Sequence, residues 1–310
     1  SDVYKRQLYD SAGSDSFTGG PASGHMTYPS GVVNTARGFS RVWAYSTSAA
    51  PGQSDTTVLY GSAGNDRLDG KEPFSMMYYT ASPSWFNYCV YGFDALTADV
   101  GATDATTGGT PGGTDVASLW DSTGNDSFTG GPLSGHMTYA SGKVNAASGF
   151  PKVYVYSLAT PGGSDTVVLY GSAGDNRFFG REGFSWLYYS ADSSWFNYVQ
   201  GFDTVTADMG VTDPYPPGTG GSAGGTDTAW LYDSADNDRL VGGPASVRMA
   251  YHPTESVAIT ASGFQKVYAY ASTGTDTAEE HGSAGDDRFK GWEKSGWMYY
   301  SPEPDNSWFI

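Results

Sequence analysis

The sequence is poor in several residue types, and each shortage narrows the class of protein. A single cysteine, Cys89, cannot form an internal disulfide, so the disulfide framework of small secreted domains is excluded. No apolar run approaches the roughly 20 residues that a membrane-spanning helix needs, so we expect no membrane insertion. The chain has only 16 Lys and Arg but 33 Asp and Glu, and the resulting net charge of −17 argues against a nucleic-acid partner.

Glutamate is scarce among the acids, which are mostly aspartate, a residue that favours turns. The 43 Gly and 16 Pro interrupt the chain too often for long helices. Between these turn formers, runs such as Thr228–Tyr232 and Lys266–Tyr270 place apolar residues at every second position. This alternation is typical of β-strands and predicts an all-β protein.

One segment recurs six times, and its copies begin at residues 8, 59, 119, 169, 231 and 280. Two versions alternate, so that copies of the same version lie about 111 residues apart. A regular period of this kind predicts a stacked array in which each unit buries its apolar face against its neighbours. We therefore expect about 111-residue super-repeats, each made of two half-units.

The repeat sets the expected domain boundaries. Residues 1–7 resemble a translated sequencing-adapter scar and are set apart as a probable artefact. Three repeat units follow at 8–118, 119–230 and 231–310, the last of them truncated, and together they should form one continuous solenoid. We expect both ends to be truncations of a longer protein, or to be covered by neighbouring molecules that stack head to tail into a filament.

Two turn types carry the aspartates, and they lie 11 residues apart. Asp55 closes a Gly-Gly-Ser-Asp type of turn, and Asp66 closes Ser-Ala-Gly-Asn-Asp. Eleven residues is one short strand and one tight turn, which predicts a parallel β-solenoid of the β-helix or β-roll kind. An antiparallel propeller is the rival fold, and it is disfavoured because Asn-Gly hairpin loops are missing.

The second turn type resembles a known repeat. Gly61–Asp69 and Gly282–Lys290 are similar to the calcium-binding nonapeptide of RTX proteins, Gly-Gly-x-Gly-x-Asp-x-apolar-x. The resemblance implies a parallel β-roll, calcium held between stacked turns, and export from the cell. The longer pattern at 224–238 also resembles repeats of giant secreted proteins from environmental bacteria. In this chain Ser replaces the second Gly, and one copy carries Asn176 where the acid is expected.

Calcium is thus the candidate cofactor, although Asx turns that need no metal explain the same aspartates. First-type units favour the metal, because each puts two carboxylates into one short turn and like charges repel unless something neutralises them. The candidate calcium ligands are Asp10, Asp15, Asp55, Asp66, Asp115, Asp121, Asp126, Asp165, Asp227, Asp233, Asp238, Asp276 and Asp287.

The remaining motifs give no unique catalytic constellation, since every acid has a counterpart in another unit, and we expect no enzyme. The predicted function is that of an extracellular or cell-surface structural or adhesive repeat protein. The alternative is a carbohydrate-binding module that binds a polysaccharide through rows of aromatic side chains. Asn125 begins the one glycosylation sequon. The aromatic candidates are Trp85, Phe86, Trp195, Phe196 and Trp308.

Overall fold

The computed structural model describes residues 5–47, 53–79, 87–158, 163–189, 195–210, 225–251, 255–285, 287–292 and 295–300. All regular secondary structure in these ranges is β-strand, and no helix able to cross a bilayer occurs among them. The chain separates into two compact units, 1–128 with 133–163 and 129–132 with 164–310. Each unit is described by itself below.

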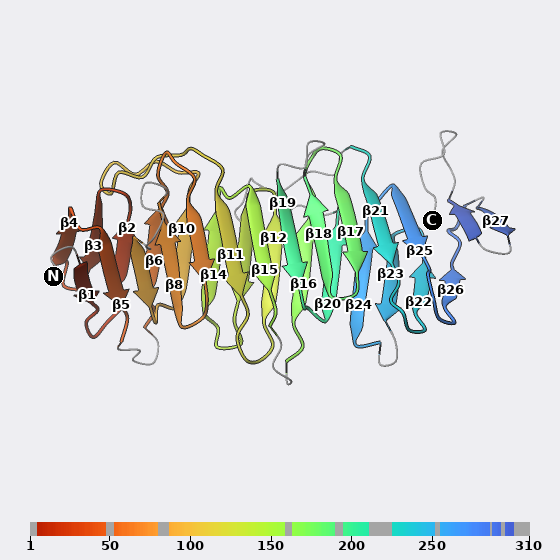
Figure 1. Ribbon diagram of the computed structural model, residues 1–310, viewed down its shortest axis with the longest axis horizontal. Coiled ribbons are helices and arrows are strands. Elements are labelled where there is room, and N and C mark those ends of the chain that lie inside the picture. Colours follow the sequence, from red (N-terminus) through yellow and green to blue (C-terminus); the bar gives the residue numbers. More distant parts are fainter. Residues whose placement is uncertain are drawn as a thin grey trace. The chain divides into compact units, whose positions relative to one another are not determined.

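The first unit consists of two sheets, here called A and B (Figure 1). Sheet A has the strand order β1-β5-β9-β8-β7-β11-β15, and sheet B has the order β4-β3-β2-β6-β10-β14-β13. The strands of sheet A are β1 (Lys5–Tyr9), β5 (Arg41–Tyr45), β7 (Arg67–Gly70), β8 (Phe74–Tyr78), β9 (Tyr88–Tyr91), β11 (Val116–Trp120) and β15 (Lys152–Tyr156). Those of sheet B are β2 (Ser16–Gly19), β3 (Ser23–Thr27), β4 (Val33–Arg37), β6 (Thr56–Tyr60), β10 (Ala95–Asp99), β13 (Ser134–Thr138) and β14 (Val144–Ser148). Strand β12 (Ser127–Gly131) is divided between the units.

The second unit repeats this plan. Its sheet A runs β19-β18-β17-β21-β25, and its sheet B runs β26-β22-β23-β24-β20-β16. Strands β27 (Arg288–Trp292) and β28 (Ser295–Tyr299) form a separate two-stranded sheet. The remaining strands are β16 (Thr166–Tyr170), β17 (Arg177–Arg181), β18 (Phe184–Tyr188), β19 (Phe196–Gln200), β20 (Thr204–Asp208), β21 (Thr228–Tyr232), β22 (Arg239–Gly242), β23 (Ser246–Tyr251), β24 (Val257–Ser262), β25 (Lys266–Tyr270) and β26 (Thr277–Glu280).

The chain passes from one sheet to the other and returns to pair in parallel with the preceding coil. Leu8 of β1 is opposite Ala44 of β5, and Leu59 of β6 is opposite Ala98 of β10, each in a parallel pair. These pairs confirm the predicted solenoid, and β21 and β25 confirm the two strands predicted from alternation. Strand β1 includes residues 5–7, which the sequence analysis had set apart.

Antiparallel meanders interrupt the coils, and the sequence analysis did not foresee them. Strands β2, β3 and β4 form such a meander in sheet B, and β7, β8 and β9 form one in sheet A. Their turns do not use Asn-Gly. The turn between β17 and β18 is Glu182-Gly183, with Gly183 at a φ of 83°, and Leu133 turns at 61° between β12 and β13. Hairpins are therefore present, but as inserts within a parallel array and not as propeller blades.

Side chains that point between the two sheets form the core. The first leucine of the recurring segment is buried in five copies, Leu8, Leu59, Leu119, Leu169 and Leu231, each at most 2% exposed. The alternation in sequence therefore becomes an inward apolar row and an outward row of other residues. This arrangement leaves the turns at the strand ends, where the aspartates lie, as the positions of chemical interest.

Candidate metal centres

Several parallel strands of the array are preceded by a side chain that connects two successive coils. In sheet B of the first unit, the Asp15 N–H donates to Asp55 Oδ1 at 2.7 Å, and the Asp55 N–H donates to Asp94 Oδ2 at 2.9 Å. In sheet A, the Asp66 N–H donates to Asp115 Oδ1 at 2.6 Å. The second unit repeats the arrangement, as where the Asp238 N–H donates to Asp276 Oδ1 at 2.9 Å. These aspartates therefore hold successive coils in register.

The same carboxylates also close their own turns. In the Ser-Ala-Gly-Asn-Asp turn, the Ser62 N–H donates to Asp66 Oδ2 at 2.5 Å and the Ser62 hydroxyl donates to Oδ1 at 2.7 Å. This explains the Ser in place of the second Gly of the RTX pattern, because its hydroxyl is a donor to the acid four residues later. Asp126 with Ser122 and Asp287 with Ser283 make the same turn.

Three carboxylates converge at one corner of the first unit. Asp10 follows β1, Asp15 precedes β2, and Asp55 precedes β6 in the next coil; one ligand oxygen from each lies within 4.8 Å of the others. Asp15 and Asp55 are only 1% and 2% exposed. The corner also holds hydroxyl groups, since the Ser46 hydroxyl donates to Asp55 Oδ2 at 2.7 Å and the Thr47 hydroxyl donates to Asp10 Oδ1 at 2.8 Å.

The second unit contains an equivalent corner, formed by Asp233, Asp238 and Asp276 under the same distance criterion. Asp233 takes the place of Asp10, and its carboxylate accepts hydrogen bonds from the Ser272 N–H at 2.5 Å and the Ser272 hydroxyl at 2.9 Å. Asp233 and Asp238 are 8% and 2% exposed. These two corners are named the three-carboxylate corners, Asp10/Asp15/Asp55 and Asp233/Asp238/Asp276.

The donor set of a three-carboxylate corner fits a hard divalent cation. Calcium takes oxygen ligands at 2.3–2.6 Å, so two oxygens that share one ion lie at most about 5 Å apart. The three carboxylates satisfy this limit, and their mutual repulsion is relieved by a cation. They come from two successive coils, so a shared ion would connect those coils. The pair of acids in one turn was visible in the sequence, whereas the third acid depends on the register between coils.

The remaining predicted ligands belong to neither three-carboxylate corner. Asp121 repeats the position of Asp10 and accepts the Leu158 N–H at 3.0 Å, and Asp126 is 1% exposed. Asp165 donates its N–H to Asp203 Oδ2 at 2.8 Å within the second unit. Asp66 and Asp115 form a two-carboxylate corner, and Asp227 faces Asn176.

Burial affects the acids of the two-carboxylate corner. Burial, together with the charge of Asp66, raises the pKa of Asp115 to about 6, although the hydrogen bond from the Asp66 N–H opposes the shift. Burial also raises the pKa of Asp66, against the hydrogen bonds from Ser62. The fold thus confines two carboxylates in a setting that disfavours their charged forms.

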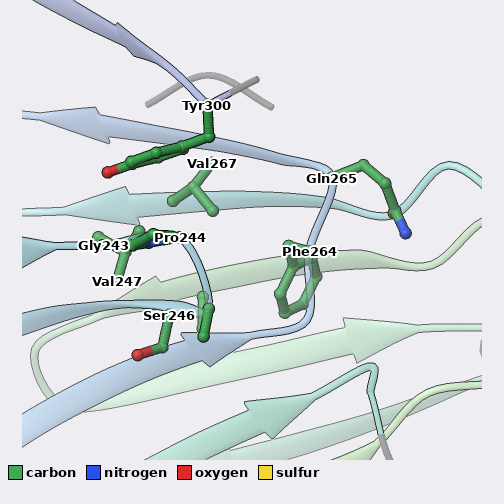
Figure 2. A pocket seen from close by; sticks show the side chains of 10 residues that line it. Gly243, Pro244, Ser246, Val247, Phe264, Gln265, Val267 and Tyr300 are labelled. Atoms are coloured by element: carbon green, nitrogen blue, oxygen red, sulfur yellow. The ribbon is translucent and has the colours of Figure 1, made fainter. Parts of the chain in front are cut away.

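The Cys89 thiol and the His25 ring are both held in structural contacts. Cys89 is 1% exposed, and burial raises the pKa of its thiol to about 11. The ring nitrogens of His25 bond to the hydroxyls of Ser23 and Thr35 at 2.9 and 3.0 Å. A small cavity of about 10 Å³ in the second unit (Figure 2) has room for about one water molecule. Its lining includes Ser246, Phe264 and Tyr300.

The aromatic and glycan candidates fall in different places. Trp85, Phe86 and Trp308 lie outside the described residues. Trp195 is 42% exposed just before β19, and Phe196 is the first residue of that strand. Asn125 is exposed in the turn before β12. Carbohydrate binding and glycosylation at these positions stay predictions.

Comparison with known proteins agrees with the motif that the turns display. The family model described as the RTX calcium-binding nonapeptide repeat (4 copies) matches residues 52–72 and 162–187. This confirms the resemblance to RTX repeats in a minor part of the chain, and RTX nonapeptide repeats bind calcium. No curated protein and no solved structure matches the chain significantly. The family that matches is a repeat family and not a catalytic one, and the expectation of a non-enzymatic role stays a prediction.

Proposed function

We propose that this chain is part of an extracellular structural or adhesive repeat protein whose coils are fastened by calcium at the three-carboxylate corners. The observation that carries the proposal is the convergence of three carboxylates from two successive coils, in a chain that also matches calcium-binding repeats. The role is mechanical: an ion shared by two coils resists their separation.

The Asp10/Asp15/Asp55 corner supports a specific mode of stabilisation. Asp15 and Asp55 are buried at the start of neighbouring parallel strands, and Asp10 closes the same corner from the end of β1. A cation here neutralises acids that otherwise repel one another across the junction between coils. Because the unfolded chain has no such arrangement, calcium binding adds directly to the free energy of unfolding.

The ligand set also favours an extracellular setting. Only three carboxylates meet at each corner, and their oxygens are shared with Ser and Thr hydrogen bonds. Calcium affinity rises with the number of charged ligands and with site rigidity, and extracellular modules bind at about 10⁻⁴–10⁻³ M. We expect this weak range, in which the sites fill outside the cell and empty inside it.

The test is the dependence of thermal stability on calcium. The melting temperature should rise by several degrees between a chelator and about 5 mM calcium, a concentration well above the expected dissociation constant. Isothermal titration should give fewer bound ions for Asp10→Asn, which keeps an acceptor for Thr47 but removes one charge. Asp99→Asn is the matched control, since Asp99 lies outside both corners and its carboxylate accepts the Gly101 N–H two residues later. Equal melting temperatures with and without calcium would exclude the metal role.

We also propose that copies of the protein associate head to tail into a filament. Its support is the repeat itself, because parallel strands that pair coil to coil can in principle pair between molecules by the same hydrogen bonds. Electron microscopy at rising protein concentration tests it. Filaments with a regular axial repeat are expected, and monodisperse single particles at all concentrations would contradict this assembly.

A further inference from the structure

The two sheets present different residues on their outer faces. In sheet A the outward strand positions are mostly aromatic, whereas the outward strand positions of sheet B carry mainly Thr, Ser and Ala, together with Tyr60 and Tyr170. The outward rings of sheet A in the first unit are Tyr9, Trp43, Tyr45, Phe74, Tyr78, Tyr91, Trp120, Tyr154 and Tyr156. In the second unit they are Phe179, Phe184, Trp186, Tyr188, Phe196, Tyr198, Trp230, Tyr232, Tyr268 and Tyr270.

The rings of sheet A follow one another along the stack of coils. Tyr45 stacks on Tyr9 with centroids 4.9 Å apart and on Tyr91 at 5.0 Å, with interplanar angles of 13° and 10°. In the second unit Phe179 and Trp230 stack at 4.7 Å, and Tyr232 and Tyr270 at 5.1 Å. These separations match the strand spacing of about 4.8 Å, so neighbouring strands add rings to a row that is interrupted at β7, where Lys71 lies over the rings of Phe74 and Trp120.

This aromatic face is also where positive charge gathers in an acidic protein. The outward cations of sheet A contrast with a single acid in its strands, Asp69, which forms an ion pair with Arg67 at 2.6 Å. Sheet B instead presents outward acids such as Asp99, Asp208 and Glu279. The outward cations of sheet A are Lys5, Arg41, Arg67 and Lys152 in the first unit and Arg177, Arg181 and Lys266 in the second.

The cations and the rings lie within reach of one another. The Arg67 guanidinium is 5.2 Å from the Tyr78 ring centroid, and the Arg181 guanidinium is 5.1 Å from that of Phe184. A shallow open hollow over β7, β11 and β15 is lined by the strand residues Arg67, Val116, Ser118, Tyr154 and Tyr156 and by the turn residues Asn65, Asp66 and Thr114. A ligand in this hollow meets flat apolar rings and positive charge together.

We infer that the outer face of sheet A binds an acidic polysaccharide, with its sugar rings on the aromatic rows and its carboxylates at the Lys and Arg side chains. The apolar face of a pyranose ring packs on an aromatic ring, and a polymer of repeated sugars matches a row that repeats with every coil. Charge complementarity selects an acidic polymer over a neutral one, because this face collects cations in a chain of net charge −17. The inference goes beyond the proposed function and does not depend on calcium.

The test measures binding of the full 310-residue chain to polygalacturonate, dextran and oligo(dT) by titration calorimetry in a chelator. Chelation prevents calcium from linking polygalacturonate to the acidic face, so the result is independent of the metal proposal. We expect polygalacturonate to bind at least tenfold more tightly than dextran or oligo(dT). Equal binding to dextran, or tighter binding to oligo(dT), would overturn the inference.

Variants locate the site. The combined substitutions Arg41→Gln and Lys152→Gln in the first unit with Arg177→Gln and Lys266→Gln in the second should weaken polygalacturonate binding at least tenfold. The control combines Arg37→Gln and Arg248→Gln, which remove outward cations from sheet B, and should change binding less than twofold. Trp43→Ala with Tyr45→Ala should weaken binding, and Tyr60→Ala on sheet B should not. Unfolding curves show that each variant is folded, and equal losses for the sheet A and sheet B sets would contradict the proposed face.

Discussion

Two corners that match the same repeat family differ by one atom type at the central side chain. In the first unit Asp66 accepts the Ser62 N–H and hydroxyl at 2.5 and 2.7 Å, and its own N–H donates to Asp115. In the second unit Asn176 accepts the Ser172 N–H and hydroxyl at 3.0 and 2.8 Å, and its N–H donates to Asp227 at 2.8 Å. The backbone arrangement is the same, although one corner has two carboxylates and the other has one.

The difference teaches that the corner needs an oxygen acceptor and not a charge. The Asn176 amide also donates to Asp227 Oδ1 and the Gly174 carbonyl, both at 2.8 Å, so it replaces the second charge with hydrogen bonds. Asp66 cannot make these donations when ionised, and its charge helps to raise the pKa of Asp115. The Asn176 corner and the Asp66 corner therefore have the same structural role. The Asp66 corner has two carboxylates that a cation could bind, and the Asn176 corner has one.

The largest expected loss of stability comes from substitutions that disrupt both corners to the same extent. Gly113 and Gly225 lie two residues before Asp115 and Asp227 at φ values of 85° and 82°, and a Cβ at either position would overlap the backbone of the preceding turn. Gly113→Ala and Gly225→Ala should each lower the free energy of unfolding by about 3 kcal/mol, from the left-handed conformation and the steric overlap combined. Urea unfolding measures it. Gly142→Ala is the control, since Gly142 has a φ of 88° but open space around it. A loss no greater than that of the control would show that close approach is unimportant.

An intermediate change in stability is expected when the central residues of the two corners are exchanged. Asn176→Asp at pH 7 should cost about 2 kcal/mol, because it places a second carboxylate beside Asp227 and removes the amide donors. Asp66→Asn should instead stabilise the protein by about 1 kcal/mol, since an amide keeps the acceptor for Ser62 and removes the negative charge next to Asp115. Both are measured by urea unfolding in a chelator. Effects of the same sign for the two substitutions would contradict the equivalence of the corners.

The smallest expected effect is on the pH dependence of stability, through the titration of Asp115. The folded pKa of Asp115, about 6, exceeds the ordinary value of 3.8, so the folded chain holds this proton more tightly than the unfolded chain. Its contribution to stability is complete below about pH 4 and is lost as the pH rises through about 6. Asp115→Asn keeps an acceptor for the Asp66 N–H, and it should reduce the loss of melting temperature between pH 5 and pH 7. An unchanged difference would mean that Asp115 does not titrate in this range.

The sequence predicted the parts of the fold that depend on local pattern. Alternation in Lys266–Tyr270 identified a strand, and the 11-residue interval from Asp55 to Asp66 identified one strand between two corners. The meanders were missed because turns such as Glu182-Gly183 lack the Asn-Gly signal, so hairpins within the coils had no clear marker.

The candidate site depended more on contacts that are distant in sequence. Asp10 and Asp15 were recognised as a pair, but the third carboxylate comes from Asp55, and only the pairing of coils brings it there. The aromatic rows were expected near Trp195, whereas the stacked rings of Tyr9 and Tyr45 occupy outward strand positions. In the sequence, Trp43 and Tyr45 alternate with Val42 and Ala44, which are buried, and this alternation indicates an outward row of rings. A search for identical residues in each copy does not detect such a row.

The alternation of meanders between the sheets has a consequence for how such a molecule can lengthen. From β1 to β10, sheet A gains β1, β5, β9, β8 and β7, and sheet B gains β10, β6, β2, β3 and β4, which is the same number of strands on each side. At about 4.8 Å per strand, one duplication advances both walls by about 24 Å. Both sheets gain the same length, so tandem copying of whole genetic blocks can change the reach of the protein while the two sheets stay equally long.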